Sequence, residues 1–182
     1  MRLFNYFAAA TLAVAVSAQA DKSPESPAVL AKAQFQWVDV AGSGIHYFST
    51  AIVHSEETTD TGMIKRTTET VDLSGDIVGR VLYQPESVFN FDQGKLTNTG
   101  NQVFSGTILG SPPLMLHDDE FRFDVNLESG ETIGRVFLVD RVAGPRARCN
   151  LTLIGTGMMT AEGDSIVDYT GKCKVRKPIT AN

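Results

Sequence analysis

Hydrophobic and polar residues alternate along this chain with the two-residue period of β-strands. The clearest example spans residues 120–127, where Phe121, Phe123, Val125 and Leu127 fall on one face and four polar residues fall on the other. No convincing amphipathic helical pattern follows the first 20 residues. The pattern therefore predicts an all-β protein.

Ten segments have this β-rich character, and turn-forming steps rich in Gly, Pro and Ser separate them. They are residues 34–40, 45–54, 63–72, 77–83, 88–91, 103–109, 120–127, 132–139, 149–156 and 165–175. Short strands at such close and regular spacing are typical of β-barrels and of β-sandwiches. Both architectures stay open on this evidence.

The last two segments predict a hairpin that a disulfide closes. Cys149 and Cys173 each lie 12 residues from Ala161, so a fold-back at that point aligns two strands of matching length. Three pairs would then face each other on one side of the ribbon, namely Cys149 with Cys173, Leu151 with Gly171, and Leu153 with Tyr169. Directly opposed residues have Cα atoms roughly 4.5–5.5 Å apart, which is within or close to the range that a disulfide requires.

The N-terminus has the plan of a secretory signal peptide. Arg2 precedes an apolar stretch at residues 7–16, and the small-residue ending Ala18-Gln19-Ala20 stands directly before a polar residue. We expect cleavage after Ala20 and export to the periplasm or the outside of the cell, where a cysteine pair forms a structural disulfide. No later segment approaches the ~20 apolar residues of a membrane span. The predicted organisation is a signal peptide at 1–20, a flexible leader at 21–33, one β-domain at 34–176 and a tail at 177–182.

Charge limits the partners that the protein can have. The net charge of −5 argues against general nucleic-acid binding. From Arg141 onward the balance reverses, with 7 basic and 3 acidic residues. Two interpretations follow. The basic charges keep a solvated strand edge from aggregating, or they form a docking patch for an anionic partner.

The C-terminal strands resemble those of one known family. The Gly-Thr-Gly step at 155–157 and the segment Gly-Asp-Ser-Ile-Val-Asp-Tyr at 163–169 are similar to the end of the allene oxide cyclase and dirigent barrels. The resemblance extends to residues 72–83 and to the Phe-Ser-Gly-Thr step at 104–107. It implies an antiparallel eight-stranded barrel, often oligomeric, secreted in the dirigent branch, with an apolar central cavity. A β-sandwich is the alternative fold.

The resemblance also implies a function but not a set of catalytic residues. Members of the family steer the cyclisation or coupling of a reactive apolar substrate without a cofactor. Their functional carboxylates cannot be placed on this chain by motif, and the cysteine pair is not a hallmark of the family. The weak candidates for polarising a substrate are Arg80, Tyr83, Asp124 and Tyr169. Arg80 and Asp124 qualify only if they face the lumen and not the solvent.

We predict neither a metal site nor a cofactor. The acidic run at 117–120 (His-Asp-Asp-Glu) lacks the alternation of a calcium loop, so a solvated turn before a strand is the preferred interpretation. His46 and His54 share a strand parity but would lie about 26 Å apart in a straight strand, which excludes joint ligation. Each is interpreted as a lone surface or rim histidine.

Bulky apolar residues favour a cavity more than they favour catalysis. The predicted strands carry 12 aromatic residues, enough to fill an eight-stranded barrel or to line one that is partly empty. Met158 and Met159 at the proposed turn would suit an apolar lip of a cavity or a subunit contact. We therefore predict an exported barrel that binds a small apolar ligand or a protein partner. The alternative is a cofactor-independent cyclase or isomerase, which a carboxylate and an arginine converging in the cavity would favour.

Overall fold

The computed structural model describes residues 34–176, which form one antiparallel sheet. Its strands are β1 (Phe35–Thr59), β2 (Gly62–Gly75), β3 (Ile77–Asn90), β4 (Lys95–Ile108), β5 (Leu114–Asn126), β6 (Thr132–Leu138), β7 (Asp140–Ala143), β8 (Arg148–Met159) and β9 (Ser165–Arg176). None of these residues is helical, so no described helix could cross a membrane. The predicted signal peptide (1–20), leader (21–33) and tail (177–182) lie outside the described residues.

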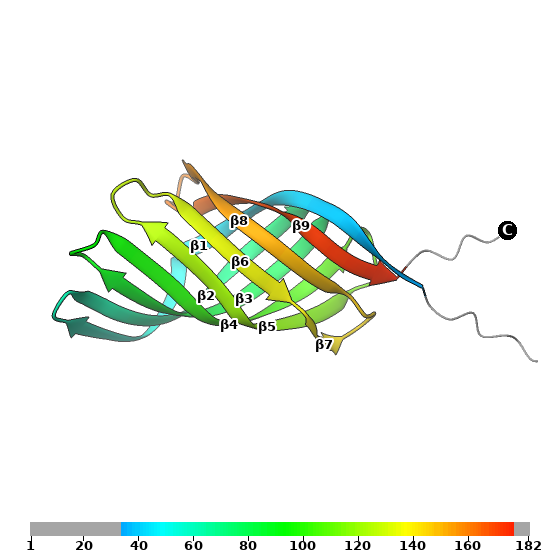
Figure 1. Cartoon of the computed structure of the whole chain (residues 1–182), viewed down its shortest axis with the longest axis horizontal. Coiled ribbons are helices and arrows are strands. Elements are labelled where there is room, and N and C mark those ends of the chain that lie inside the picture. Colours follow the sequence, from blue (N-terminus) through cyan, green and yellow to red (C-terminus); the bar gives the residue numbers. More distant parts are fainter. Residues whose placement is uncertain (1–33, 177–182) are drawn as a thin grey trace, which may run out of the picture. The chain divides into compact units, whose positions relative to one another are not determined.

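Eight of the strands close into a barrel (Figure 1). Their order around the ring is β4-β3-β2-β1-β9-β8-β6-β5, and pairing of β5 with β4 completes the circle. The short strand β7 pairs with β5 outside the ring. The predicted eight-stranded antiparallel barrel is confirmed, and the sandwich alternative is wrong.

The strands are fewer and longer than the sequence pattern predicts. Segments 34–40 and 45–54 fall in β1 except for Gln34, and segments 77–83 and 88–91 fall in β3 except for Phe91. Pro85 made the second pair look interrupted, since proline has no N–H to donate. It lies inside β3, and the pairing of β3 with β2 is interrupted between Tyr83 and Glu86. Strand β7 was not predicted, because all of its residues are exposed and give no alternation.

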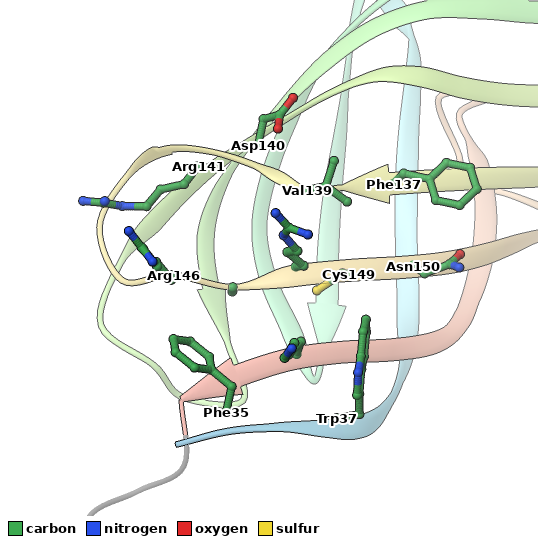
Figure 2. Close-up of a pocket in the computed structure, with 12 residues that line it drawn as sticks. Phe35, Trp37, Phe137, Val139, Asp140, Arg141, Arg146, Cys149 and Asn150 are labelled. Carbon is green, nitrogen blue, oxygen red and sulfur yellow. The ribbon is translucent and has the colours of Figure 1, made fainter. Parts of the chain in front are cut away.

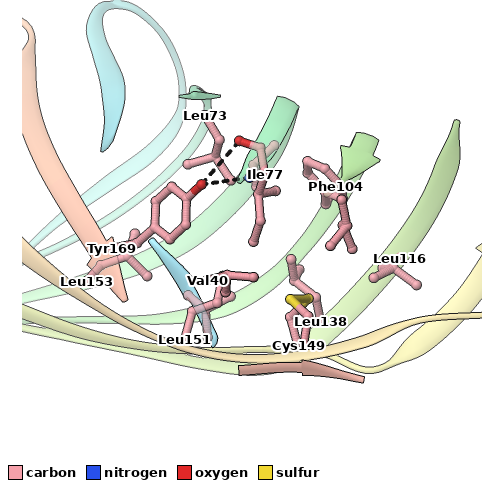
Figure 3. Close-up of a cluster of buried hydrophobic side chains, with 14 of the residues drawn as sticks. Val40, Leu73, Ile77, Phe104, Leu116, Leu138, Cys149, Leu151, Leu153 and Tyr169 are labelled. Carbon is pink, nitrogen blue, oxygen red and sulfur yellow. Dashed lines mark hydrogen bonds between the residues drawn. A yellow bond between two sulfur atoms is a disulfide. The ribbon is translucent and has the colours of Figure 1, made fainter. Parts of the chain in front are cut away.

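Apolar side chains pack most tightly in one half of the lumen. Five residues from five strands have no exposed surface there, namely Ile77, Phe104, Leu116, Leu138 and Cys173. Register places them together, because Ile77 pairs with Ile108 at the start of β3 and Leu138 pairs with Cys149 at the end of β6. Figure 3 shows this cluster. We call this half of the barrel the closed end.

The hydroxyl of Tyr169 ties β9 to the turn between β2 and β3 (Figure 3). It accepts a hydrogen bond from the backbone N–H of Ile77 at 2.8 Å and donates to the carbonyl oxygen of Ser74 at 3.0 Å. Gly42 of β1 lies against this contact. A Cβ at position 42 would stand 2.4 Å from the tyrosine oxygen and 2.1 Å from the Ser74 oxygen, so only glycine fits.

The C-terminal hairpin has the predicted register and the predicted disulfide. The pairs are Cys149 with Cys173, Leu151 with Gly171, and Leu153 with Tyr169. The two cysteine Cα atoms are 4.1 Å apart and the sulfurs are bonded. Both cysteines are buried at the closed end, so the disulfide joins β8 to β9 inside the packed core.

We expect Cys149→Ser and Cys173→Ser to lower the melting temperature by similar amounts, with the double variant no worse than either. One shared bond requires this non-additivity. A loop of this length is worth about 3 kcal/mol in the chain-entropy model, or roughly 10 °C in melting temperature for a domain of this size. Scanning calorimetry of the three variants measures it. Additive losses would show that the cysteines contribute separately.

Tyr169→Phe should destabilise the barrel by about 1–3 kcal/mol, because it leaves the buried N–H of Ile77 without an acceptor. Urea unfolding measures the loss. Tyr47→Phe is the matched control, since the hydroxyl of Tyr47 reaches only the part-exposed carboxylate of Asp72, at 3.3 Å. Equal losses in the two variants would contradict the role assigned to Tyr169.

Candidate functional site

The half of the lumen away from the closed end contains a cavity of about 250 Å³. Phe48 and Met159 line it and are 48% and 64% exposed, which marks the opening. The walls are mainly apolar, with Val71, Val81 and Leu153 among them. The polar residues of the lining are His46, Tyr83, Asn98, Gln102, Thr132, Ser165 and Tyr169.

A histidine and a glutamate form a hydrogen-bonded pair at this cavity. His46 of β1 pairs in register with Val71 of β2, and Glu69 is two residues from Val71 on the same face. This diagonal relation brings His46 Nε2 against Glu69 Oε2. The second carboxylate oxygen of Glu69 accepts a hydrogen bond from Thr67 Oγ1 at 2.6 Å. Both side chains are largely buried, with 14% of His46 and 9% of Glu69 exposed.

Two opposing effects set the pKa of Glu69. Burial is the largest effect and alone would raise the pKa, because an apolar wall disfavours the charged form. Hydrogen bonds from His46 and Thr67 act in the other direction, and the charges of His46 and Lys65 add to them. The pKa of Glu69 lies below its ordinary value as a result. Glu69 is therefore a carboxylate at neutral pH, which can orient the imidazole of His46 and stabilise its protonated form.

Tyr83 stands beside the pair in an aromatic cluster. Its ring is 5.4 Å from the His46 ring, edge to face, and 4.6 Å from the ring of Phe121. Only 3% of Tyr83 is exposed. Burial, followed by the charge of Glu69, raises the pKa of Tyr83 well above its ordinary value, and a side-chain hydrogen bond with Asn98 opposes the shift. The phenol therefore stays neutral and can act as a hydrogen-bond donor.

One acceptor in the cavity wall has no donor. Asn98 of β4 lines the cavity, and its buried Oδ1 has no hydrogen-bond partner within residues 34–176. The amide of Gln102, four residues further along β4, does have a partner, because it donates to the buried carboxylate of Asp118 at 2.8 Å. An unpaired buried acceptor costs free energy. A molecule that brings a donor to Asn98 would recover that cost.

Hydrogen bonds between two distant segments fix the rim of the cavity, and we call this contact the latch. Asp164 in the turn after β8 accepts hydrogen bonds from Ser49 of β1, at 2.8 Å from the backbone N–H and at 2.9 Å from the hydroxyl. Asp164 is only 2% exposed. The latch keeps the turn next to β1 and so places Met159 at the opening. The predicted apolar lip is confirmed for Met159, while Met158 is exposed and is not part of the lining.

The four candidate catalytic residues do not converge. Tyr83 and Tyr169 line the cavity, but the hydroxyl of Tyr169 is already used in the closed end. Arg80 faces the solvent, where its guanidinium makes two hydrogen bonds to Asp72 at 2.6 and 2.7 Å. Asp124 also lies outside the barrel and is paired with Arg122 at 2.7 Å. The polar row of residues 120–127 therefore faces solvent and not the lumen.

Two interpretations of the acidic and histidine residues need correction. Residues 117–120 are not a solvated turn. They belong to β5, at a register shift that turns Asp118 inward, where it also accepts the backbone N–H of Phe137 at 2.8 Å. His46 is not a lone histidine, and register shifts in β1 between residues 47 and 55 break the parity it was expected to share with His54. Within residues 34–176, no group of three or more His, Cys, Asp or Glu could hold a metal.

Glu69 was not among the residues predicted from the sequence, although a signal was present. Val71 and Leu73 are inward residues of β2, and Glu69 has their parity. A glutamate on the apolar face of a strand requires a partner, because an isolated buried charge is too costly. That partner is His46, which is 23 residues away in the sequence. Only the pairing of β1 with β2 identifies it.

Glu69→Gln should cost about 1–3 kcal/mol of unfolding free energy at pH 7, and the cost should shrink as the solution becomes acidic. The folded-state pKa is depressed, so ionised Glu69 stabilises the fold above its unfolded pKa of about 4.3. This contribution is lost as pH falls through the folded-state pKa. Urea unfolding at pH 7 and near pH 3.5 tests this. Glu86→Gln, in an exposed pair with Arg66, is the control, and a pH-independent difference for Glu69→Gln would contradict the prediction.

Comparison of the chain with known protein families, with curated proteins and with solved structures finds no match in any of the three. The resemblance of the C-terminal strands to allene oxide cyclase and dirigent barrels therefore stays a prediction. What the molecule does has to be argued from the geometry of its cavity.

Proposed function

We propose that this protein is an exported barrel that binds a small apolar ligand in its lumen. The observation that carries the proposal is a preformed apolar cavity with one opening side and a packed core beneath it. Apolar walls with a few placed polar groups are the usual composition of a ligand site. A lumen required only for stability would be filled by side chains throughout, as the closed end is.

The size of the cavity restricts the ligand. Its volume of about 250 Å³ is near the lower limit of sites that hold drug-sized molecules, which is about 300 Å³. The ligand is therefore compact, on the scale of a bicyclic ring system. The long, flexible chain of a fatty acid would not fit without displacing the core.

Asn98 adds a chemical requirement to this size. A ligand with a hydroxyl or amine group can donate to the unpartnered Oδ1, and an apolar body then fills the space between Val81 and Leu153. Tyr83 offers a neutral phenol on the same wall. The preferred ligand is thus a small apolar molecule with one donor group.

Export forms part of the proposal. The disulfide between Cys149 and Cys173 agrees with an oxidising compartment. The signal-peptide pattern of residues 1–20 points the same way. A ligand present outside the cytoplasm is therefore the one to look for.

A cofactor-independent isomerase or cyclase is the second candidate, and the pair of His46 and Glu69 favours it. In such a reaction His46 would accept a proton from a substrate carbon or hydroxyl and return it elsewhere, with Glu69 fixing the ring and stabilising its charged form. We rank binding first because an enzyme of this kind was expected to have an arginine and a carboxylate together in the cavity. The described lining contains no arginine, and Arg80 lies on the outer face of the barrel. Native mass spectrometry of protein from its own host would identify a co-purifying molecule. Its conversion by the wild type, and not by His46→Gln, would place the isomerase first.

Binding of 1-naphthylamine tests the proposal. We expect a saturable change in its fluorescence with the wild type. Leu153→Phe, which fills part of the cavity, should weaken binding by about tenfold or more, the effect of at least 1.4 kcal/mol. Ile154→Phe adds similar bulk at the next residue, which faces solvent and is 51% exposed, and should leave binding unchanged. Equal affinities of both variants and the wild type would contradict binding in the lumen.

A donor-free analogue tests the role of Asn98 in the same assay. The analogue 1-methylnaphthalene has the shape of 1-naphthylamine without the donor and should compete more weakly. In Asn98→Leu the preference between the two molecules should disappear. An unchanged preference would mean that Asn98 does not receive the donor, although the cavity could still be the binding site.

A further inference from the structure

We propose that a groove on the outer wall at the closed end binds an organic anion with an aromatic body. The groove, shown in Figure 2, has a volume of about 680 Å³ and shares no lining residue with the cavity in the lumen. Aromatic and cationic side chains line it together, chiefly Phe35, Trp37, Phe137, Arg146, Arg148 and Lys174. This inference goes beyond the proposed function, because it concerns a second site with a different ligand chemistry.

Two cations stand side by side in this groove without a counter-charge. Arg148 of β8 is directly opposite Lys174 of β9 in the ladder, and both are exposed. Like charges directly opposite each other are unfavourable in a sheet. Within residues 34–176, no carboxylate lies within 4.0 Å of either cation. An anion between the two would relieve their repulsion.

Several other basic residues on the outer wall are compensated. Arg80 pairs with Asp72, and Arg122 pairs with Asp124. Lys172 is two residues from Lys174 on the same outward face, and its Nζ lies 3.5 Å from the carboxylate of Asp39. Asp140 is the carboxylate among the residues that line the groove, and it makes no ion pair with Arg148 or Lys174. Within residues 34–176, Lys95, Arg135 and Arg176 are also exposed without an ion pair, but none of them lines the groove. The groove is distinguished by two unpaired cations that lie directly opposite each other beside exposed aromatic rings.

Exposed aromatic rings complete the site. Trp37 of β1 is directly opposite Lys174, so Trp37, Lys174 and Arg148 form a row across three neighbouring strands. Trp37 is 57% exposed and Phe35 is 39% exposed. Figure 2 shows both rings among the residues that line the groove. A planar aromatic body can stack on the indole while its anionic group reaches the two cations.

The disulfide makes this arrangement permanent. Cys149 and Cys173 form the next pair in the ladder after Arg148 and Lys174, and their side chains point to the opposite face, into the core. The covalent bond therefore keeps β8 and β9 in register where two like charges would otherwise push them apart. The cationic pair exists before any ligand arrives, which lowers the ordering cost of binding.

Trp37 provides a direct test, because it is the single tryptophan of the chain. Its indole N–H gives one resonance in a ¹H–¹⁵N NMR spectrum of the full chain. Titration with naphthalene-2-sulfonate should shift that resonance saturably. The neutral analogue naphthalene-2-sulfonamide should require about tenfold more ligand, because it lacks the charge that the two cations recognise. Inorganic sulfate should bind without the large ring-current shift of a stacked aromatic ring.

Three variants that each remove one positive charge distinguish binding in this groove from a general attraction of the anion to basic residues. Lys174→Gln and Arg148→Gln should each weaken binding of the sulfonate by about fivefold or more. Lys172→Gln removes the same charge from the same face and should leave the affinity unchanged. Melting temperatures of Lys174→Gln and Arg148→Gln at or above that of the wild type would show that the variants are folded and that the like-charge contact is relieved.

Several results would overturn the proposal. They are the absence of a saturable shift of the Trp37 resonance, an equal response to the sulfonamide, and equal losses in Lys174→Gln and Lys172→Gln. Failure here leaves the lumen proposal intact, because the groove and the cavity share no lining residue and Leu153→Phe fills part of the cavity without changing the groove. A loss of sulfonate binding in Leu153→Phe would instead mean that the sulfonate enters the lumen.

Discussion

Closure of β5 onto β4 is the constraint on which the rest of this molecule depends. Without it, the sheet would have two exposed edges and no enclosed interior. With it, the inward side chains must fit into an interior whose volume is set by the number of strands. Large residues such as Phe104 and Leu116 fill that volume at one end. At the other end the inward residues include small or polar ones, such as Ser165 and Asn98, and space is left over.

The same closure explains which polar groups the lumen contains. A carboxylate that is buried in the barrel wall or at its rim needs hydrogen-bond donors from the protein, because water reaches it poorly. Glu69 has His46 and Thr67, Asp164 has Ser49, and Asp118 has Gln102. These contacts are satisfied and hold the wall together. Asn98 is different, because its buried oxygen has no hydrogen-bond partner within residues 34–176 and can accept a donor from a ligand.

The parts that the sequence predicted are those that local pattern determines. The hairpin of β8 and β9 followed from symmetric spacing about one turn, and the disulfide followed from the hairpin. The pair of His46 and Glu69 could not be found in this way. It depends on the register between β1 and β2, where irregular pairing at residues 47–55 changes which side chains share a face. The inward orientation of Asp118 could not be predicted for the same reason, because a register shift between β4 and β5 turns Asp118 from the solvent face to the lumen.

A single covalent link gives the closed end two different faces. On the inside, the disulfide of Cys149 and Cys173 is part of the packed core beneath the cavity. On the outside, the adjacent residues Arg148 and Lys174 project from the same two strands, and neither has an ion-pair partner within the part of the chain that the structure describes. Strand alternation makes this possible, because neighbouring residues point to opposite sides of one wall. The disulfide that stabilises the interior therefore also fixes the distance between the two charges on the surface. It keeps β8 and β9 paired although Arg148 and Lys174 repel each other.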